Sequence, residues 1–319
     1  MDYFNPLPAL PAVPSFSGST LLLPQPSLSS LAQLATDLLI HTYGLEKIGY
    51  LGLRDFVPAV SGLDGVAGEE QAEGVLFGVE VFQTPSGSLT VVLPRSPVIR
   101  ARRAHHLEAM RAFIEQAGFA EVLLVAGVDA ALRGDEGLNA MLETNANGMA
   151  NRATPLRHFV LPTTPSSSSP FPLAQRLASL APPYASSSPS GTTSSTSPAP
   201  SIPLIPHGGL TRKLIEALSL PSSPSSSSEA NLPPVSALLI YTSEGDAADS
   251  AYFLADALAD ALGKELEEVE VRAKVERLRL NVDGEQGERS GIKWKTPRSW
   301  ETGLMGPKLA REAGREMFG

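Results

Sequence analysis

Residues Val122-Leu123-Leu124-Val125 form a continuous apolar run, typical of a strand that is buried on both faces of a sheet. A helical pattern from Arg102 to Ala117 precedes this run and ends at Gly118. Two further apolar runs of strand length, Leu156 to Leu161 and Val235 to Thr242, follow later in the chain. Together these segments predict a sheet whose central strands are covered by helices on both faces.

The sequence before this run alternates helix and strand signals in the same way. Ser30 can cap a helix that extends through Tyr43, with Gly44 just past its end. A short apolar strand follows over Ile48 to Leu53. The apolar segments 75–82 and 89–93 flank the turn residues Pro85-Ser86-Gly87, which predicts a β-hairpin.

A last helix is predicted after the run at 235–242. It starts at Asp246 and carries Leu254, Leu258 and Leu262 on one face. Repeated strand–helix–strand units predict an α/β sandwich with a mostly parallel central sheet flanked by helices.

Two segments interrupt this pattern with Ser, Pro and Thr. Residues 162–203 and 221–234 hold too few apolar side chains to offset the entropy lost on ordering, so we predict disordered insertions. Within the first, Phe171 to Leu180 has the composition of one or two helical turns. We expect a single domain over residues 15–319, with a flexible C-terminal tail at 301–319.

The composition excludes several classes of protein. The formal net charge is −9, from 25 Lys and Arg against 34 Asp and Glu, which argues against a nucleic-acid or anionic-lipid partner. The chain has no cysteine, so thiol catalysis and cysteine-based metal sites are excluded. No secretory signal or transmembrane run is recognisable, and we expect a cytoplasmic protein, with the nucleus as a further candidate location.

The common catalytic motifs are also missing from the sequence. It contains no Gly-x-Ser-x-Gly elbow, no phosphate-binding loop and no Gly-x-Gly-x-x-Gly. His105 and His106 follow Arg102 and Arg103 at the polar start of a helix, where a solvated face explains them better than a metal. We therefore predict no catalytic residue, no metal and no cofactor.

Three local features leave a catalytic interpretation open. His207 to Thr211 is either an oxyanion loop or a glycine-rich helix entry. Glu244 and Asp246 lie where a strand ends and a helix begins, where carboxylates either perform acid–base chemistry or cap the helix. Arg133 to Glu136 is a charged loop that follows the strand at 122–125. The structural interpretation is favoured for each of them.

Four segments occur in an order that resembles the proteasome assembly chaperone 2 family. They are Gly18 to Pro24 with Gln33 to Ile40 and Lys47 to Tyr50, then Gly208 to Leu214, then Ser243 to Asp246, and finally Lys293 to Trp300. The resemblance implies an α/β fold that is phosphorylase-like without catalysis. It also implies a heterodimer with proteasome assembly chaperone 1 that binds the proteasome α subunits and promotes core-particle assembly.

The resemblance further implies a C-terminal tail that enters a pocket of the α-ring. Met317 would supply the hydrophobic residue and Gly319 the carboxylate, while Phe318 stands where the family has Tyr. The alternatives are a phosphorylase- or hydrolase-like enzyme that uses Glu244 and Asp246, or a homo-oligomeric scaffold. The absence of a nucleophile motif favours the non-catalytic chaperone.

Overall fold

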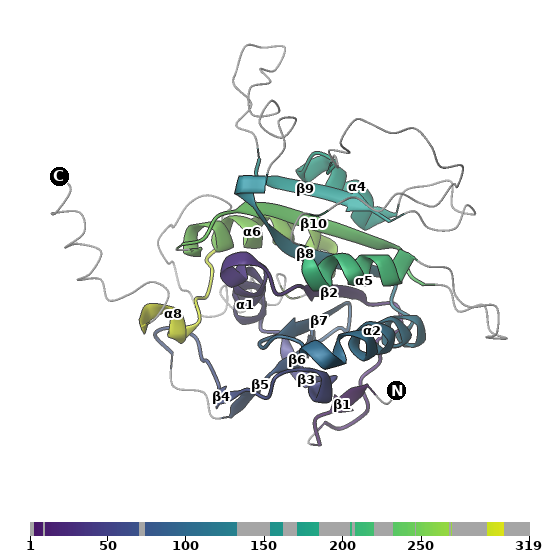
Figure 1. The fold of residues 1–319 in the computed structure, drawn as a ribbon. Coiled ribbons are helices and arrows are strands. Elements are labelled where there is room, and N and C mark those ends of the chain that lie inside the picture. Colours follow the sequence, from purple (N-terminus) through teal and green to yellow (C-terminus); the bar gives the residue numbers. More distant parts are fainter. Residues whose placement is uncertain are drawn as a thin grey trace, which may run out of the picture.

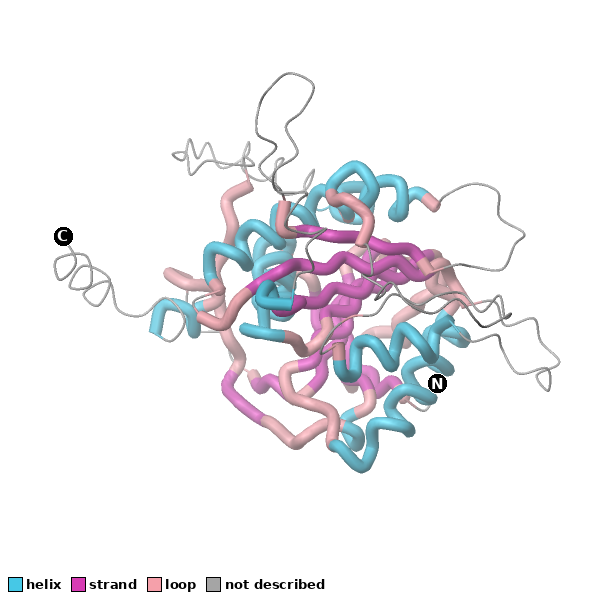
Figure 2. Tube along the Cα trace, turned by 45° about the horizontal axis from the view of Figure 1, so that its top comes forward, coloured by secondary structure: helices cyan, strands magenta, loops and turns pink. Residues whose placement is uncertain are grey.

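The computed structural model describes residues 3–8, 10–69, 74–132, 154–161, 171–184, 205, 208–219, 232–245, 247–267, 269 and 292–302. These residues form an α/β sandwich in which helices cover both faces of an eight-stranded sheet (Figure 1). Figure 2 shows the same layers from another side, with the strands between two groups of helices.

The sheet has the strand order β1-β3-β6-β7-β2-β8-β10-β9, and β4 pairs with β5 in a separate two-stranded ribbon. The strands are β1 (Phe4–Pro6), β2 (Thr20–Pro24), β3 (Glu46–Leu51), β4 (Val60–Gly62), β5 (Val75–Phe77), β6 (Val79–Gln83), β7 (Leu89–Pro94), β8 (Glu121–Asp129), β9 (Leu156–Val160) and β10 (Val235–Thr242).

The sheet is mixed, with a parallel centre and antiparallel flanks. β2 runs parallel to β7 and β8, and β8 runs parallel to β10. The pairs β1–β3, β3–β6, β6–β7 and β9–β10 are antiparallel. The predicted α/β class is confirmed, and the predicted parallel pairing is found at the centre of the sheet. The short connection between β6 and β7 permits only antiparallel pairing, because a parallel pair needs a long crossover.

The helices form one layer on each face of the sheet. The α-helices of the described residues are α1 (Leu31–Tyr43), α2 (Arg103–Ala117), α4 (Pro172–Leu180), α5 (Gly209–Ser219), α6 (Ala248–Ala261) and α8 (Arg298–Thr302). Short 3₁₀ helices are η1 (Leu28–Ser30), η2 (Leu53–Asp55), η3 (Arg100–Arg102) and η4 (Ala130–Leu132). Helices α1, α4 and α6 pack on one face, and α2 and α5 pack on the other.

The central strands divide their side chains between these two layers. On β8, Leu123 and Val125 join the core under α1 and α6, whereas Val122 and Leu124 join the core under α2 and α5. Side chains of a strand alternate between faces, so a run that is apolar at every position fills both cores. The apolar run that predicted a strand buried on both faces is therefore confirmed.

Several predicted boundaries agree with the structure. α1 and α2 end at Gly44 and Gly118, whose φ angles of +60° and +72° lie in the left-handed region that glycine tolerates best. Ser30 occupies the predicted cap position of α1 but makes no side-chain capping hydrogen bond. α6 begins at Ala248 with Ala247 in the cap position, so the helix starts later than the predicted cap at Asp246, which lies outside the described residues.

The structure corrects the predicted disorder of the first insertion for residues 171–184. Here α4 packs on the core with Leu173 and Leu177 fully buried. The Leu173 N–H donates to Glu121 Oε2 at 3.1 Å, and Arg176 forms an ion pair with Glu265 at 2.8 Å. Burial of two leucines and these polar contacts offset the ordering cost that the surrounding composition suggested.

The structure also corrects the predicted start of the domain and the predicted hairpin. The domain begins before residue 15, because β1 pairs with β3 and Phe4 is buried. The predicted hairpin consists only of β6 and β7, because residues 75–77 form β5, which pairs with β4. Most of 221–234 and of 301–319 lies outside the described residues.

None of the described helices combines the length and the apolar character that crossing a bilayer requires.

Candidate functional site

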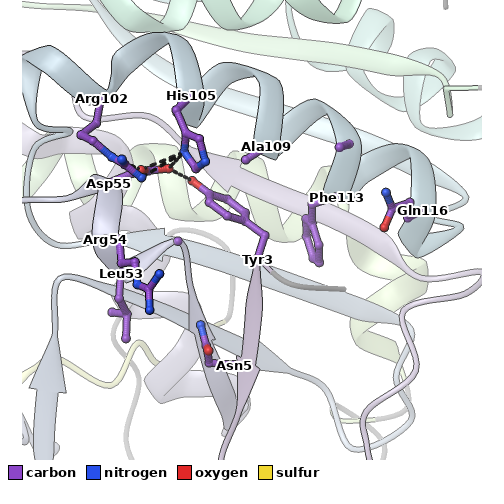
Figure 3. Close-up of a pocket in the computed structure, with 12 residues that line it drawn as sticks. Tyr3, Asn5, Leu53, Arg54, Asp55, Arg102, His105, Ala109, Phe113 and Gln116 are labelled. Atoms are coloured by element: carbon purple, nitrogen blue, oxygen red, sulfur yellow. Dashed lines mark hydrogen bonds and ion pairs between the residues drawn. The ribbon is translucent and has the colours of Figure 1, made fainter.

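A pocket of about 580 Å³ opens beside α2, at the end of the sheet that carries β1. Figure 3 shows Ala109, Phe113 and Gln116 along α2 on one side, Arg54 and Asn5 on the opposite side, and Tyr3 between them. Its remaining polar lining residues are Asp55, Arg102 and His105. The pocket therefore combines apolar helix side chains with a cluster of charged groups.

Asp55 is the centre of this charged cluster, which we call the Asp55 cluster: Tyr3, Asp55, Arg102, His105 and His106. The Asp55 side chain is fully buried, yet both oxygens accept hydrogen bonds. Arg102 Nε lies 2.8 Å from Oδ1, and the Tyr3 hydroxyl lies 2.9 Å from Oδ2. His105 Nδ1 lies 3.0 and 2.9 Å from the two oxygens. A buried carboxylate requires such compensation.

Local folding brings these partners together from three segments. Asp55 ends η2, and its carbonyl accepts the N–H of Ile99 at 2.8 Å, which holds η2 against the start of α2. Arg102 and His105 come from η3 and the first turn of α2, where the helix dipole also favours a negative charge. Tyr3 reaches the cluster from the chain just before β1.

The electrostatics keep Asp55 ionised. Burial alone would raise its pKa, but the hydrogen bonds from His105, Tyr3 and Arg102 together hold the pKa below its ordinary value. Burial raises the pKa of Tyr3 well above its ordinary value, and its hydrogen bond to Asp55 acts in the same direction. Tyr3 is therefore a neutral donor to a carboxylate.

His106 completes the cluster from the buried side of α2. Its ring is 4 % exposed, and burial lowers its pKa to about 4. Nδ1 lies 2.8 Å from the Tyr3 hydroxyl. Because that hydroxyl uses its single hydrogen on Asp55, it must accept from His106, which assigns the neutral tautomer with the proton on Nδ1. The ring also packs edge-on against Phe56, with centroids 5.0 Å apart.

A second buried charge cluster joins α1 to the antiparallel strands. Arg95 bridges Asp37 at 2.8 Å and the fully buried Glu80 at 3.1 Å, and Lys47 lies 3.2 Å from Glu80. Burial would lower the pKa of Arg95, but the two carboxylates raise it above its ordinary value. This cluster does not line the pocket beside α2, so we assign it a structural role.

Comparison with known proteins assigns the chain to a family. The model of the PAC2 family matches residues 21–283, which is more than half of the chain. The chain belongs to the PAC2 family. The match includes Asp55, Arg102 and His105, whereas Tyr3 and Asn5 precede it.

Curated relatives of this PAC2-family protein carry the name Proteasome assembly chaperone 2. The Danio rerio protein is 29% identical over 152 residues, which cover 48% of this chain and 54% of the relative. The Xenopus laevis protein is 33% identical over 146 residues, which cover 46% of this chain and 51% of the relative. The chain spans about half the length of the curated relatives it matches.

Solved structures with a similar arrangement include two Pyrococcus furiosus proteins. PbaA, described as an archaeal homolog of proteasome-assembly chaperone, has a TM-score of 0.47 and 14% identity, covering 84% of this chain and 94% of PbaA. PbaB, described as an archaeal proteasome activator, has a TM-score of 0.45 and 14% identity, covering 88% of this chain and 98% of PbaB.

Most of the residues that the sequence singled out lie outside the residues that the structure describes in this PAC2-family protein. Glu244 is exposed in the turn after β10, and Asp246 lies outside the described residues. Gly208 and Gly209 lead directly into α5, as the helix-entry interpretation predicts. The remaining candidates also lie outside the described residues, namely His207, Arg133 to Glu136, and the tail residues Met317, Phe318 and Gly319.

Sequence reasoning missed the Asp55 cluster. The predicted solvated face holds for Arg103 and His105, which are exposed, but it is wrong for His106, which is buried against Phe56 and Tyr3. One signal was available, since two adjacent histidines on a helix must point to different faces. No sequence pattern predicts the hydrogen bond between Tyr3 and Asp55, which are 52 residues apart. Among the described residues no group of His, Asp and Glu side chains is arranged to hold a metal ion.

Proposed function

We propose that this protein is a proteasome assembly chaperone. In this proposal it forms a heterodimer with proteasome assembly chaperone 1, binds the ring of proteasome α subunits and promotes core-particle assembly. The observation that carries the proposal is the PAC2-family match over residues 21–283, together with curated relatives named Proteasome assembly chaperone 2. We place this activity in the cytoplasm and also in the nucleus.

An interface with a partner chaperone requires exposed apolar surface, and the β4–β5 ribbon offers it. Val60 is 67% exposed, Val75 is 45% exposed, and the adjoining Val57 is 43% exposed. The register pairs Val60 with Phe77 and Gly62 with Val75, so Val60 and Val75 lie on the same face of the ribbon. Exposed apolar groups that gather in one place are typical of protein-binding surfaces.

Native mass spectrometry of the chain with and without proteasome assembly chaperone 1 tests the partnership. We expect a 1:1 heterodimer that Val60→Asp weakens by at least tenfold, because a charge replaces an exposed apolar contact. Val13→Asp is the matched control, since Val13 is 79% exposed and lies outside the ribbon. A stable homo-oligomer that ignores the partner would support the scaffold alternative instead.

The α-ring contact is proposed for the C-terminal tail, which lies outside the described residues. Met317 and Phe318 would fill an apolar pocket between α subunits, and the carboxylate of Gly319 would pair with a basic group there. Removing residues 317–319 should weaken binding to purified core particles and leave the heterodimer intact. Phe318→Tyr should strengthen binding by about 1 kcal/mol, the net value of one hydrogen bond.

We also propose that the protein has a phosphorylase-like fold but no catalytic activity. Of the two carboxylates that such an enzyme would use, Glu244 is exposed and does not line the pocket beside α2, and Asp246 lies outside the described residues. Assays of nucleoside phosphorolysis and ester hydrolysis test this directly. Turnover by the pure protein that Glu244→Gln abolishes would establish the enzyme alternative.

A further inference from the structure

The pocket beside α2 has a positive lining in a protein that is strongly acidic as a whole. Arg54 and Arg102 contribute two positive charges and Asp55 one negative charge, so the lining carries a formal charge of 2 − 1 = +1 with His105 neutral. The whole chain carries −9. A positive pocket on an acidic protein focuses anions at that place.

Asp55 does not offer its charge to a ligand, because its side chain is fully buried and both oxygens are occupied by Tyr3, Arg102 and His105. Its role is to orient the basic groups. Arg102 binds Asp55 through Nε, and its Nη2 lies 3.4 Å from a His105 nitrogen that already donates to Asp55. The terminal amino groups of Arg102 therefore remain available as donors.

Arg54 supplies a second guanidinium from the opposite wall. It is exposed, lines the pocket, and forms no ion pair with any residue that the structure describes. Guanidinium groups match the oxygens of carboxylates and phosphates in a fixed planar geometry. Figure 3 shows Arg54 and Arg102 on different walls but toward the same end of the pocket, away from Phe113 and Gln116.

The other end of the pocket is apolar. Ala109 and Ala112 line this end from α2, together with the small exposed part of Phe113, whose ring otherwise packs against Phe16 and Phe119. The two alanines leave room along the helix, and the pocket volume of about 580 Å³ falls within the range that small organic ligands occupy. Asn5 and Gln116 add neutral hydrogen-bonding groups at the rim.

We propose that this pocket binds a small organic anion, an oxyanion group attached to an apolar or aromatic body. Arg54 and Arg102 hold the oxyanion, and Phe113, Ala109 and Ala112 contact the body. This site is separate from the residues proposed to contact a partner chaperone or the α-ring, and it does not depend on either contact.

Titration of the full chain by calorimetry tests the proposal with defined probes. Phenyl phosphate and phenylacetate carry the two oxyanions on an aromatic body, whereas inorganic phosphate lacks the body and phenylacetamide lacks the charge. N-acetylphenylalanine and its amide ask whether the end of a peptide chain is accepted. We expect binding of at least one aromatic anion, at least tenfold weaker binding of phosphate alone, and no binding of the neutral amides.

Two variants and a control locate the site. Arg54→Gln should weaken binding by about tenfold or more through loss of one charge-assisted contact. Ala112→Phe should abolish binding by occupying the apolar end of the pocket, and because Ala112 is partly exposed the fold should tolerate it. Arg100→Gln is the matched control, because Arg100 is exposed on η3 but does not line the pocket.

Three results would overturn the proposal. They are binding of the amides as strongly as the acids, equal loss of affinity in Arg100→Gln and Arg54→Gln, or no detectable binding of any anionic probe at millimolar concentration. Unfolding curves for each variant are measured in parallel, so that a folding defect is recognised and the remaining variants decide.

Discussion

His106 makes the stability of this protein depend on pH in a defined window. Burial lowers the pKa of its ring to about 4, from 6.5 in an exposed histidine. Between these two values the unfolded chain binds a proton that the folded protein excludes, so stability falls as the pH is lowered through this window. One pKa unit corresponds to about 1.4 kcal/mol. The predicted loss attributable to His106 between pH 6.5 and pH 4 is therefore about 3 kcal/mol.

The variant His106→Asn isolates this contribution. An asparagine amide can donate to the Tyr3 hydroxyl as Nδ1 of His106 does, but it does not titrate. Burial also lowers the pKa of His41, so the wild-type slope contains a second contribution of the same sign. Asp55 acts in a different window: its pKa is below 3.8, so its contribution is complete above pH 3.8 and is lost only as the pH falls further.

Urea unfolding measured at steps between pH 7 and pH 4 provides the comparison. The difference in unfolding free energy between wild type and His106→Asn should shrink by about 3 kcal/mol across this range. In a His41→Asn background, this difference should shrink with pH by the same amount. Parallel curves for wild type and His106→Asn would refute the reasoning, because they would mean that the His106 ring is protonated without penalty in the folded protein.

Three further predictions concern stability. Leu177→Ala should lower the free energy of unfolding by about 2–5 kcal/mol in urea, because the side chain of Leu177 on α4 is fully buried. The exposed Ser179→Ala should change it by less than about 0.5 kcal/mol. Deletion of residues 186–200 should leave the thermal midpoint unchanged, whereas deletion of 165–200, which includes α4, should lower it; equal midpoints would mean that α4 contributes nothing. Glu80→Ala should cost about 3–5 kcal/mol, since it leaves Arg95 without one of its two carboxylates, and a calorimetric midpoint equal to wild type would contradict this.

The elements of the fold that were predictable are those whose signal is local. β8, β10, α1 and α2 each follow from an apolar run or a helical repeat that ends at a glycine, and the structure places all four close to the expected residues. β1 was not predictable, because three residues with a proline carry no periodicity. α4 was underestimated, because the composition of 162–203 outweighs the apolar spacing of Leu173 and Leu177.

The candidate site was predictable only in part. Arg102, His105 and His106 lie within five residues of one another, but Asp55, which binds Arg102 and His105, is about 50 residues away. Such a contact depends on how η2 packs against α2, which no local pattern encodes. Family membership was predictable from short segments, of which those between residues 21 and 283 lie in the range that the family model matches, whereas Lys293 to Trp300 lies beyond it.

The parallel centre of the sheet has a consequence for the order of folding during synthesis. β6 and β7 pair Phe82 with Val91 and can form as soon as both have left the ribosome, whereas β10 pairs Leu238 with Val125, which is 238 − 125 = 113 residues earlier. At about 5–20 residues per second, translation needs roughly 6–23 s to supply that partner. Throughout this interval one edge of β8 presents unpaired backbone groups flanked by apolar side chains, the kind of edge on which chains aggregate. We therefore expect pulsed amide exchange to protect β6 and β7 first and β8 and β10 last, and nascent chains released before residue 242 to be the aggregating species.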